Sequence, residues 1–92
     1  MFSDIIGIDN LKSIDLHGEV SDIANVLVKD FIYDCFKSKE KYCVVIHGKG
    51  ANIIRNVVND VLKYSEYVED YKLYYYNDGC TIVKLKQENI CS

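Results

Sequence analysis

The chain has no excess of positive charge, and this absence excludes one class of function. Eleven lysines and arginines face 14 aspartates and glutamates among 92 residues, which gives a formal net charge of −3. A strongly basic nucleic-acid-binding protein is therefore excluded on bulk charge. The charge is uneven, because residues 1–34 carry two basic and seven acidic groups, whereas residues 35–92 carry nine basic and seven acidic ones. We therefore expect any anion-binding site in the second part of the chain.

The sequence also lacks long apolar runs and clustered cysteines. No run approaches the ~18–20 apolar residues that span a membrane, and the first residues lack the basic start and apolar stretch of a signal peptide. No C-x-x-C pair is present, so a structural zinc site is not expected. We expect a cytoplasmic protein without membrane contact. Its reduced thiols should pack as small apolar groups; they belong to Cys35, Cys43, Cys80 and Cys91.

The length and the order of patterned segments predict one domain over residues 13–86, with an N-terminal lead-in of residues 1–12 and a C-terminal tail of residues 87–92. The predicted strands are residues 14–17, 42–46, 71–76 and 80–86, with helices after Ser21 and Asn52 and a hairpin turn at 77–79. Right-handed crossovers make the first two strands parallel and put both helices on one face of the sheet. The predicted fold is α/β in the broad sense, an α+β two-layer sandwich. Its order is β-α-β-α-β-β, with a four-stranded mixed sheet.

Apolar stripes identify both helices. The first stripe repeats every four residues and has a second column beside it; the two columns are Ile23, Leu27, Phe31 and Cys35, and Ala24, Val28, Ile32 and Phe36. The second helix has Ile53, Val57 and Val61 beside Ile54, Val58 and Leu62. Ser21 and Asn52 are predicted as the N-caps, and Asp22 places negative charge in the first turn of the first helix.

The only two histidines of the chain follow two predicted strands at equivalent places, in Leu16-His17-Gly18 and Ile46-His47-Gly48. Ligands of parallel α/β sheets collect at the carboxyl ends of the strands, so both imidazoles are expected at one edge of the sheet. Asp15 and His17 are two residues apart and should project from the same face, while Ile14 and Leu16 point toward the helices. The alternative is that both histidines are structural.

A glycine-rich turn follows the second histidine. Glycines in Gly48-Lys49-Gly50 let backbone N–H groups approach an anion, and the following helix adds partial positive charge at its N-terminus. Lys49 and Arg55, the only arginine, would complete a phosphate seat. A simple tight turn between strand and helix explains the same residues. Together with two groups that transfer protons near neutral pH, the pattern favours binding, and in one interpretation cleavage, of a phosphodiester.

A second surface is suggested by tyrosines and lysines near the C-terminus. Tyr74 and Tyr76 share a strand face with Lys72, and Lys84 lies on the next strand. Such a face could stack nucleobases. The alternative is that the tyrosines only cover the sheet face without helices.

The motifs at these positions resemble the Smr (small MutS-related) domain family. The family has a D-L-H-G motif after a short first strand, an H-G-x-G motif before the second helix, and a glycine-rich hairpin that leads into a Thr–Val strand. The corresponding residues are Asp15-Leu16-His17-Gly18, His47-Gly48-Lys49-Gly50 and Gly79-Cys80-Thr81-Ile82-Val83, with Arg55 at a Leu-Arg position of the family. The resemblance covers roughly residues 13–86. Asn52, Tyr76 and Asn77 stand where the family often has glycine.

The resemblance implies a fold similar to the C-terminal domain of translation initiation factor three, with the fourth strand antiparallel to the others. It also implies nucleic-acid binding, and in many members a DNA-nicking or RNA-cleaving endonuclease that serves DNA repair and recombination control or ribosome rescue. Asp15 and His17 correspond to the catalytic pair, and residues 47–50 to the substrate-binding loop. The implied partners are DNA or RNA, a MutS-like protein, or the ribosome.

The leading hypothesis combines both lines of reasoning. Its catalytic residues are Asp15, His17 and His47, and its substrate-binding residues are Gly18, Gly48, Lys49, Gly50 and Arg55. No cofactor is required by this set, and a divalent ion such as Mg²⁺ or Mn²⁺ is left open. The alternatives are a non-catalytic module that binds nucleic acid or a protein through the same edge, and a phosphate- or nucleotide-binding protein.

Overall fold

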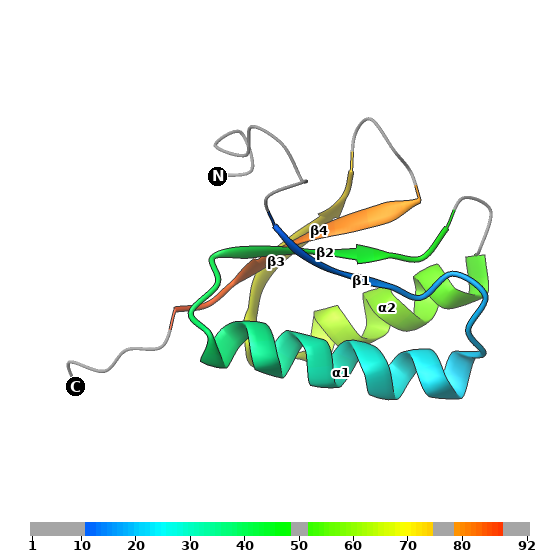
Figure 1. Cartoon of the computed structure of the whole chain (residues 1–92), viewed down its shortest axis with the longest axis horizontal. Coiled ribbons are helices and arrows are strands. Elements are labelled where there is room, and N and C mark those ends of the chain that lie inside the picture. The colour runs from blue at the N-terminus through cyan, green and yellow to red at the C-terminus, as the bar shows by residue number, and fades with distance from the viewer. Residues whose placement is uncertain (1–10, 49–51, 75–78, 88–92) are drawn as a thin grey trace.

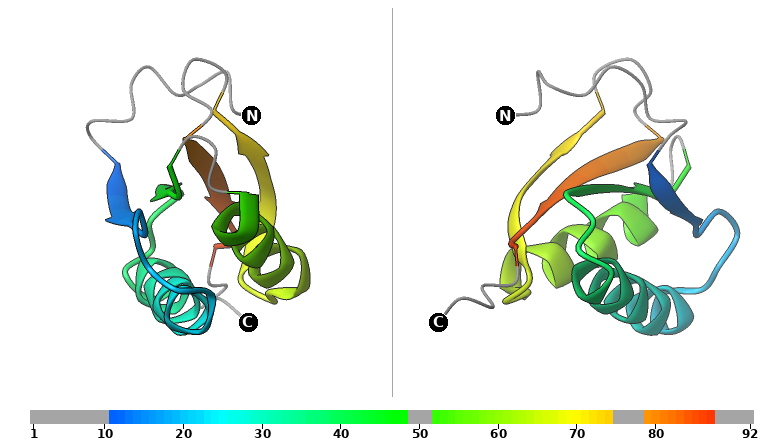
Figure 2. Two further views of the ribbon diagram at one scale, coloured as in Figure 1. Left: turned by 90° about the vertical axis from the view of Figure 1, so that its right-hand side faces the viewer. Right: turned by 60° about the vertical axis from the view of Figure 1, so that its left-hand side comes forward.

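The computed structural model describes residues 11–48, 52–74 and 79–87. Its elements follow the predicted order (Figure 1): β1 (Lys12–Asp15), α1 (Ser21–Lys37), β2 (Tyr42–Ile46), α2 (Asn52–Tyr64), β3 (Val68–Leu73) and β4 (Cys80–Leu85). Both helices lie on one face of the four-stranded sheet (Figure 2). The prediction of an α+β two-layer sandwich is confirmed. In the described part of the chain, no helix has the length and apolar character needed to cross a membrane.

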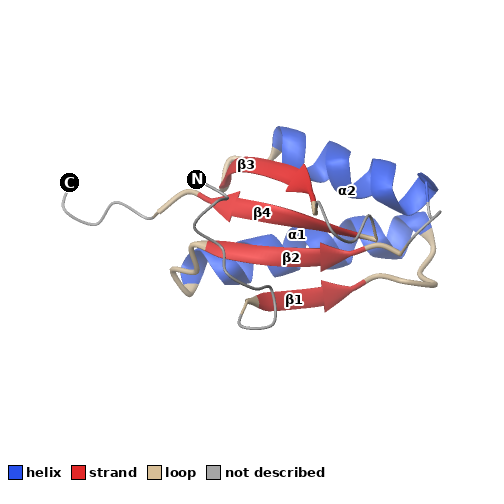
Figure 3. Ribbon diagram, turned by 90° about the horizontal axis from the view of Figure 1, so that it is seen from above, coloured by secondary structure: helices blue, strands red, loops and turns tan. Residues whose placement is uncertain are grey.

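The sheet has the order β1-β2-β4-β3, so β1 and β3 are its edges (Figure 3). β1 pairs with β2 in parallel, as a strand–helix–strand crossover requires. β4 lies between β2 and β3 and is antiparallel to both. The antiparallel fourth strand that the family resemblance implies is therefore present.

Two apolar clusters lie on the two faces of the sheet. The larger lies beneath the helices and includes Leu16, Val28, Val45, Leu62 and Val83. The smaller, on the opposite face, consists of Tyr42, Val44, Cys80 and Ile82, with Leu11, Ile46 and Tyr74 packed against it. β2 alternates between the two clusters and is buried on both faces, which accounts for its dense apolar sequence.

The buried side chains of both helices belong to the predicted stripes, but the two columns of each stripe are not equally buried. In α1 the buried side chains are Ala24, Val28, Ile32 and Cys35, whereas Ile23 is 47% exposed. In α2 Ile54, Val58, Val61 and Leu62 are buried, whereas Ile53 is 71% exposed. Both stripes are two columns wide, and the way each helix packs on the sheet decides which column is central.

Two strand boundaries also differ from prediction. β1 covers Lys12–Asp15 and not residues 14–17, because the chain turns after Leu16, whose N–H makes a last bond to the Ile46 carbonyl at 2.7 Å. β3 begins at Val68 and not at residue 71, because Val68 pairs with Leu85 near the far end of β4. The predicted hairpin turn at 77–79 lies outside the described residues except for Gly79.

The predicted N-cap of α1 is wrong by one residue. Ser21 is the first residue of α1, and Val20 occupies the cap with a side chain that makes no capping hydrogen bond. α2 begins at Asn52, its predicted cap, and the residue before it lies outside the described part of the chain. Asp22 lies in the first turn of α1, as predicted.

The end of α1 contains the one non-glycine residue with positive φ among the described positions, Lys39 at +63°. Its N–H donates to the Phe36 carbonyl, and the Glu40 N–H donates to the Cys35 carbonyl, each at 3.0 Å. This bond pair is the Schellman arrangement, in which glycine usually occupies the left-handed position.

We expect Lys39→Gly to raise the free energy of unfolding by about 0.5–1 kcal/mol. The left-handed conformation costs a side-chain-bearing residue roughly 1–2 kcal/mol, and the added freedom of glycine in the unfolded chain cancels part of the gain. Urea unfolding measures the difference. Lys39→Ala is the matched control, because it removes the same charge but keeps a β-carbon; a gain equal to that of glycine would contradict the explanation.

Candidate active site

The D-L-H-G and H-G-K-G motifs meet at one edge of the sheet. β1 and β2 are parallel neighbours in which Asp15 pairs with Ile46, and the Leu16 N–H bonds to the Ile46 carbonyl. Both strands end on the side of the molecule where α1 and α2 begin (Figure 1). The backbone of the two motifs is therefore adjacent, as the strand-end argument predicts.

Three of the four residues in Asp15-Leu16-His17-Gly18 have clear structural tasks. The Asp15 carboxylate accepts the backbone N–H of His17 at 2.9 Å. Leu16 is buried in the larger cluster, and its carbonyl accepts the Glu19 N–H at 3.0 Å, which closes a tight turn. Gly18 has φ +84° in that turn, in the region that favours glycine. The imidazole of His17 is exposed and makes no hydrogen bond to a described residue.

His47 has the opposite environment. Its side chain is 0% exposed, and its Nε2 lies 3.0 Å from the hydroxyl of Thr81. Its Nδ1 lies 3.3 Å from the Gly48 carbonyl. The expectation that this imidazole contacts a phosphate or transfers a substrate proton conflicts with its burial, because neither solvent nor substrate reaches the ring.

The strand pattern explains why the two histidines differ. Cys43 and Val45 face the helices, and His47 continues that alternation beyond the end of β2. Thr81 pairs with Val45 in the sheet and thus lies on the same face. Leu16 also points to the helix side, as predicted, which leaves His17 in the exposed turn.

Two backbone N–H groups of the H-G-K-G motif already have a hydrogen-bond acceptor within the protein. The N–H groups of His47 and Gly48 both donate to the Gly79 carbonyl at 2.8 Å. The Gly48 amide was expected to cradle an anion, but it is bound to Gly79, the residue before β4. Gly48 has φ +91°, so its glycine is needed for the backbone path. Lys49 and Gly50, expected to bind the same anion, lie outside the described residues.

Arg55 lies one turn into α2. Its Nη2 donates to the Asn52 side-chain oxygen at 2.8 Å, which holds the guanidinium beside the start of the helix. The first turn of α2 carries no acidic residue, whereas α1 has Asp22 there. A positive side chain near a helix N-terminus is unfavourable unless an anion is nearby. The start of α2 thus offers positive potential in a protein whose net charge is negative.

The described residues do not form a metal site. Over residues 11–48, 52–74 and 79–87, no group of three or more His, Cys, Asp or Glu side chains is placed to hold an ion. Asp15 and His17 are two potential donors, and the Asp15 carboxylate is already bound to the backbone. The donor set does not fit a resident divalent cation, so no chemical step is derived through one.

The cysteines behave as core residues. Cys35, Cys43 and Cys80 are buried thiols that form no disulfide, and Cys91 lies outside the described residues. A hydrogen bond with Cys35 and burial both raise the pKa of the Cys43 thiol. The same hydrogen bond lowers the pKa of Cys35. The pair is packed inside the larger cluster and takes no part in the site at the sheet edge.

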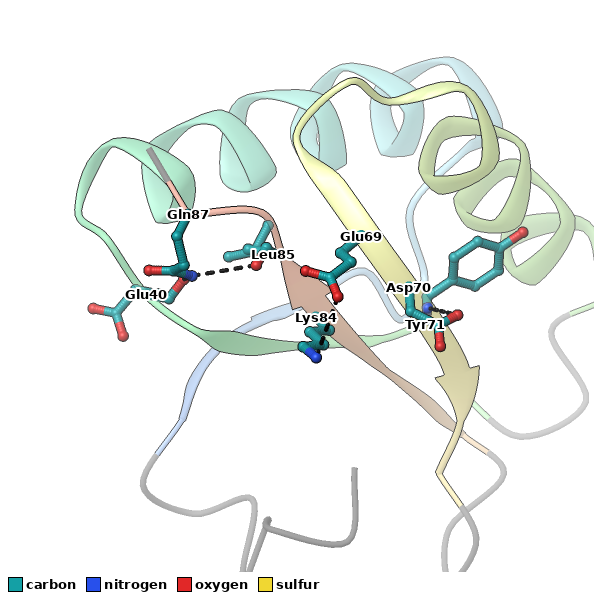
Figure 4. A network of polar contacts seen from close by, with 7 residues as sticks. All are labelled: Glu40, Glu69, Asp70, Tyr71, Lys84, Leu85 and Gln87. Atoms are coloured by element: carbon teal, nitrogen blue, oxygen red, sulfur yellow. Dashed lines mark hydrogen bonds and ion pairs between the residues drawn. The ribbon is translucent and has the colours of Figure 1, made fainter. Parts of the chain in front are cut away.

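The predicted tyrosine–lysine surface is only partly available. Lys84 makes an ion pair with Glu69 at 3.3 Å (Figure 4), so part of its charge is neutralised. Tyr74 packs against the smaller apolar cluster, and Tyr76 lies outside the described residues. These contacts favour the covering role of Tyr74 over stacking on bases.

Comparison with known proteins establishes the family. A model of the Smr domain matches residues 14–86, most of the chain. This chain belongs to the Smr domain family. The domain is similar to proteins named endonuclease MutS2: it is 36% identical to that of Clostridium novyi over 84 residues, and 37% identical to that of Clostridium botulinum strain Eklund 17B over 76 residues. These matches cover 84% and 79% of this chain but 11% and 10% of the relatives, so the chain spans about a tenth of their length.

Solved structures agree with this assignment. The Smr domain of Thermus thermophilus MutS2 has a TM-score of 0.79 at 23% identity, covering 83% of this chain and 99% of that domain, and supports the fold. YdaL, a stand-alone small MutS-related protein from Escherichia coli, has a TM-score of 0.78 at 25% identity, covering 82% of this chain and 64% of YdaL.

Thr81 and Gly79 are site residues that the sequence pattern placed only in the hairpin and the last strand, without a role at the site. Thr81 is 1% exposed and bonds His47, and the Gly79 carbonyl accepts two N–H groups of the histidine motif. One signal was present in the sequence. Thr81 alternates with Val83 and Leu85, so it is a polar residue at a position that should face the core.

Proposed function

We propose that this Smr domain binds nucleic acid at the edge formed by the His17 turn and the start of α2, and that it cleaves phosphodiester bonds there. One observation carries the proposal. Asp15, Leu16 and Gly18 are accounted for by the turn they build, whereas the exposed imidazole of His17 has no structural task. A turn that presents one free imidazole next to a positive helix start suits proton transfer on a bound phosphodiester.

The roles of the other residues follow from their contacts. Asp15 positions His17 by accepting its backbone N–H. Arg55 contributes a charged donor at the start of α2, and we assign a further phosphate contact to Lys49 and the Gly50 amide. Gly18 and Gly48 act through their backbone conformation, and His47 through its hydrogen bonds below the loop.

In the proposed reaction, Arg55 and the residues after Gly48 orient the phosphate and balance its negative charge. His17 then removes a proton from the attacking oxygen or donates one to the leaving oxygen. Imidazole suits either step because it changes protonation state near neutral pH. The water or ribose hydroxyl that attacks the phosphorus depends on whether the substrate is DNA or RNA.

A non-catalytic binding module is the second candidate. It is favoured by the exposed acidic residues beside the imidazole, Asp15, Glu19 and Asp22, which oppose a polyanion. It is also favoured by the burial of His47, which leaves one free imidazole where two were expected. Such a module would bind nucleic acid or a protein through the same edge without cutting.

The test is incubation of the purified protein with supercoiled plasmid and with structured RNA, each with and without a chelator. Nicked plasmid or cleaved RNA supports the endonuclease, and cleavage in chelator supports a reaction that needs no metal. Binding without cleavage of either substrate would favour the non-catalytic module. Either outcome also shows which nucleic acid is preferred.

The wider context is proposed from the relatives. Their name, endonuclease MutS2, supports a role beside a MutS-like protein in DNA repair or recombination control. Ribosome rescue remains an alternative from the family resemblance. The three buried thiols agree with a reducing compartment, and we propose the cytoplasm.

We expect Arg55→Ala to weaken nucleic-acid binding and to reduce the slope of log affinity against log salt by roughly 0.7–0.9, because one phosphate contact is lost. Fluorescence anisotropy at several salt concentrations measures the slope. Lys63→Ala is the matched control, because Lys63 is also a cation of α2 but lies in its last turn. Equal slopes for Arg55→Ala and the unmodified protein would show that the nucleic acid binds at another surface.

A further inference from the structure

A polar pair lies within an otherwise apolar interior. Among the described residues, His47 and Thr81 are the buried polar or charged side chains, at 0% and 1% exposure. Their side chains meet at 3.0 Å between Nε2 and Oγ1. They come from positions 34 residues apart, so the contact joins the H-G-K-G motif to the start of β4.

The neighbouring carbonyl defines the direction of these hydrogen bonds. The Gly48 carbonyl can only accept, so its contact with Nδ1 requires a proton on that nitrogen. In a neutral imidazole Nε2 is then the acceptor, and the Thr81 hydroxyl donates to it. The Gly48 carbonyl thereby selects the tautomer, and the Thr81 hydroxyl is the donor to Nε2 in that tautomer.

Backbone hydrogen bonds also join the H-G-K-G motif to the chain just before β4. The Gly79 carbonyl, two residues before Thr81, accepts the N–H groups of both His47 and Gly48 at 2.8 Å. The chain leaves β2 at His47, passes through Gly48 at φ +91°, and enters α2 at Asn52. Gly79 thus holds the backbone of His47 and Gly48, and Thr81 holds the side chain of His47.

We propose that Thr81 is a positioning residue of the candidate site: its hydroxyl donates to Nε2 of the buried His47 and so holds His47 and Gly48 in place at the end of β2. The consequence for substrate rests on the proposed function. Thr81 contacts neither His17 nor the described surface of the site, so it should affect substrate binding more than the chemical step. Packing alone does not require a hydroxyl here, since valine has nearly the same shape as threonine.

The experiment compares Thr81→Val, Thr81→Ser and the control Val83→Ala. Val83 lies two residues along β4 on the same buried face and belongs to the apolar cluster, so its truncation lowers stability without removing the His47 bond. Long-range ¹H–¹⁵N spectra report the tautomer of His47. Anisotropy with a labelled single-stranded oligonucleotide reports binding, and plasmid or RNA cleavage separates KM from kcat.

We expect Nδ1–H in the unmodified protein and in every variant, because the Gly48 carbonyl requires it, and shifted His47 Nε2 and Gly48 amide resonances in Thr81→Val but not in Thr81→Ser. Thr81→Val should bind the oligonucleotide roughly tenfold more weakly, the equivalent of about 1.4 kcal/mol. Its kcat should change less than KM, and Thr81→Ser should restore most of the binding. Val83→Ala should keep both the tautomer and the binding.

Three results would overturn the inference: an Nε2–H tautomer in the unmodified protein, unchanged His47 Nε2 and Gly48 amide resonances and unchanged affinity in Thr81→Val, or an equal loss of binding in Val83→Ala. A protein that binds no oligonucleotide at all would contradict the proposed function instead. In that case the Nε2 and Gly48 resonances still decide whether Thr81 positions His47 and Gly48.

Discussion

His17→Ala is expected to lower the rate of phosphodiester cleavage by at least about 100-fold, the lower end of what a general acid or base contributes. The affinity for nucleic acid should change by less than a few-fold, because the phosphate contacts come from the start of α2 and the preceding loop. The free energy of unfolding should stay within about 0.5 kcal/mol, because the side chain is exposed. Cleavage kinetics, anisotropy and urea unfolding measure the three quantities.

Glu19→Gln is the matched control for this variant. Glu19 is exposed in the same turn, and its backbone N–H, which the substitution keeps, closes that turn. The control should cut at nearly the rate of the unmodified protein, or faster, because it removes a negative charge near the substrate. If His17→Ala cuts as fast as the control, His17 is not the catalytic group, and the non-catalytic module becomes the better explanation.

The neighbouring residue should show the reverse pattern. Leu16→Ala is expected to lower the free energy of unfolding by about 2–5 kcal/mol, the range for a buried leucine truncated in a core. Leu16 is fully buried in the larger cluster, and its N–H and carbonyl tie β1 and the turn together. A loss of this size should lower Tm by about 8–40 °C, since each kcal/mol corresponds to about 4–8 °C in a domain of this size.

Leu16→Met is the control, with an expected loss under about 1.5 kcal/mol because the volume is kept. Binding of nucleic acid by Leu16→Ala should be measured at a temperature where the variant is still folded. A loss below about 1 kcal/mol for Leu16→Ala would mean that the D-L-H-G motif is not anchored in the core as the structure shows. Together, the two adjacent substitutions separate the structural and the chemical parts of one motif.

The organisation of the chain could be predicted well from local patterns. The strand at 42–46 has the predicted bounds, the element order is correct, and Ile14 and Leu16 point toward the helices. These features depend on periodicity and on glycine at turns, which act over a few residues. The boundaries of β1 and β3 were less accurate, because pairing partners that are distant in sequence decide where a strand starts and ends.

The environment of His47 could not be predicted in the same way. β2 is a central strand whose five residues are all apolar and packed on both faces, so its sequence does not show which face the helices cover. The position of His47 therefore depended on the register with β4 and on the presence of Thr81 below it. The Gly48 amide, which was expected to bind an anion, instead donates to the Gly79 carbonyl.

By itself the sequence determined the family, the order of the elements and the edge of the sheet where both histidine motifs end, because motifs and hydrophobic periodicity are properties of short segments. Only the tertiary structure decided that His17 is exposed and His47 is enclosed, and which column of each helix packs on the sheet. The physical reason is that burial depends on which surfaces meet, and those surfaces are contributed by residues far apart in the chain.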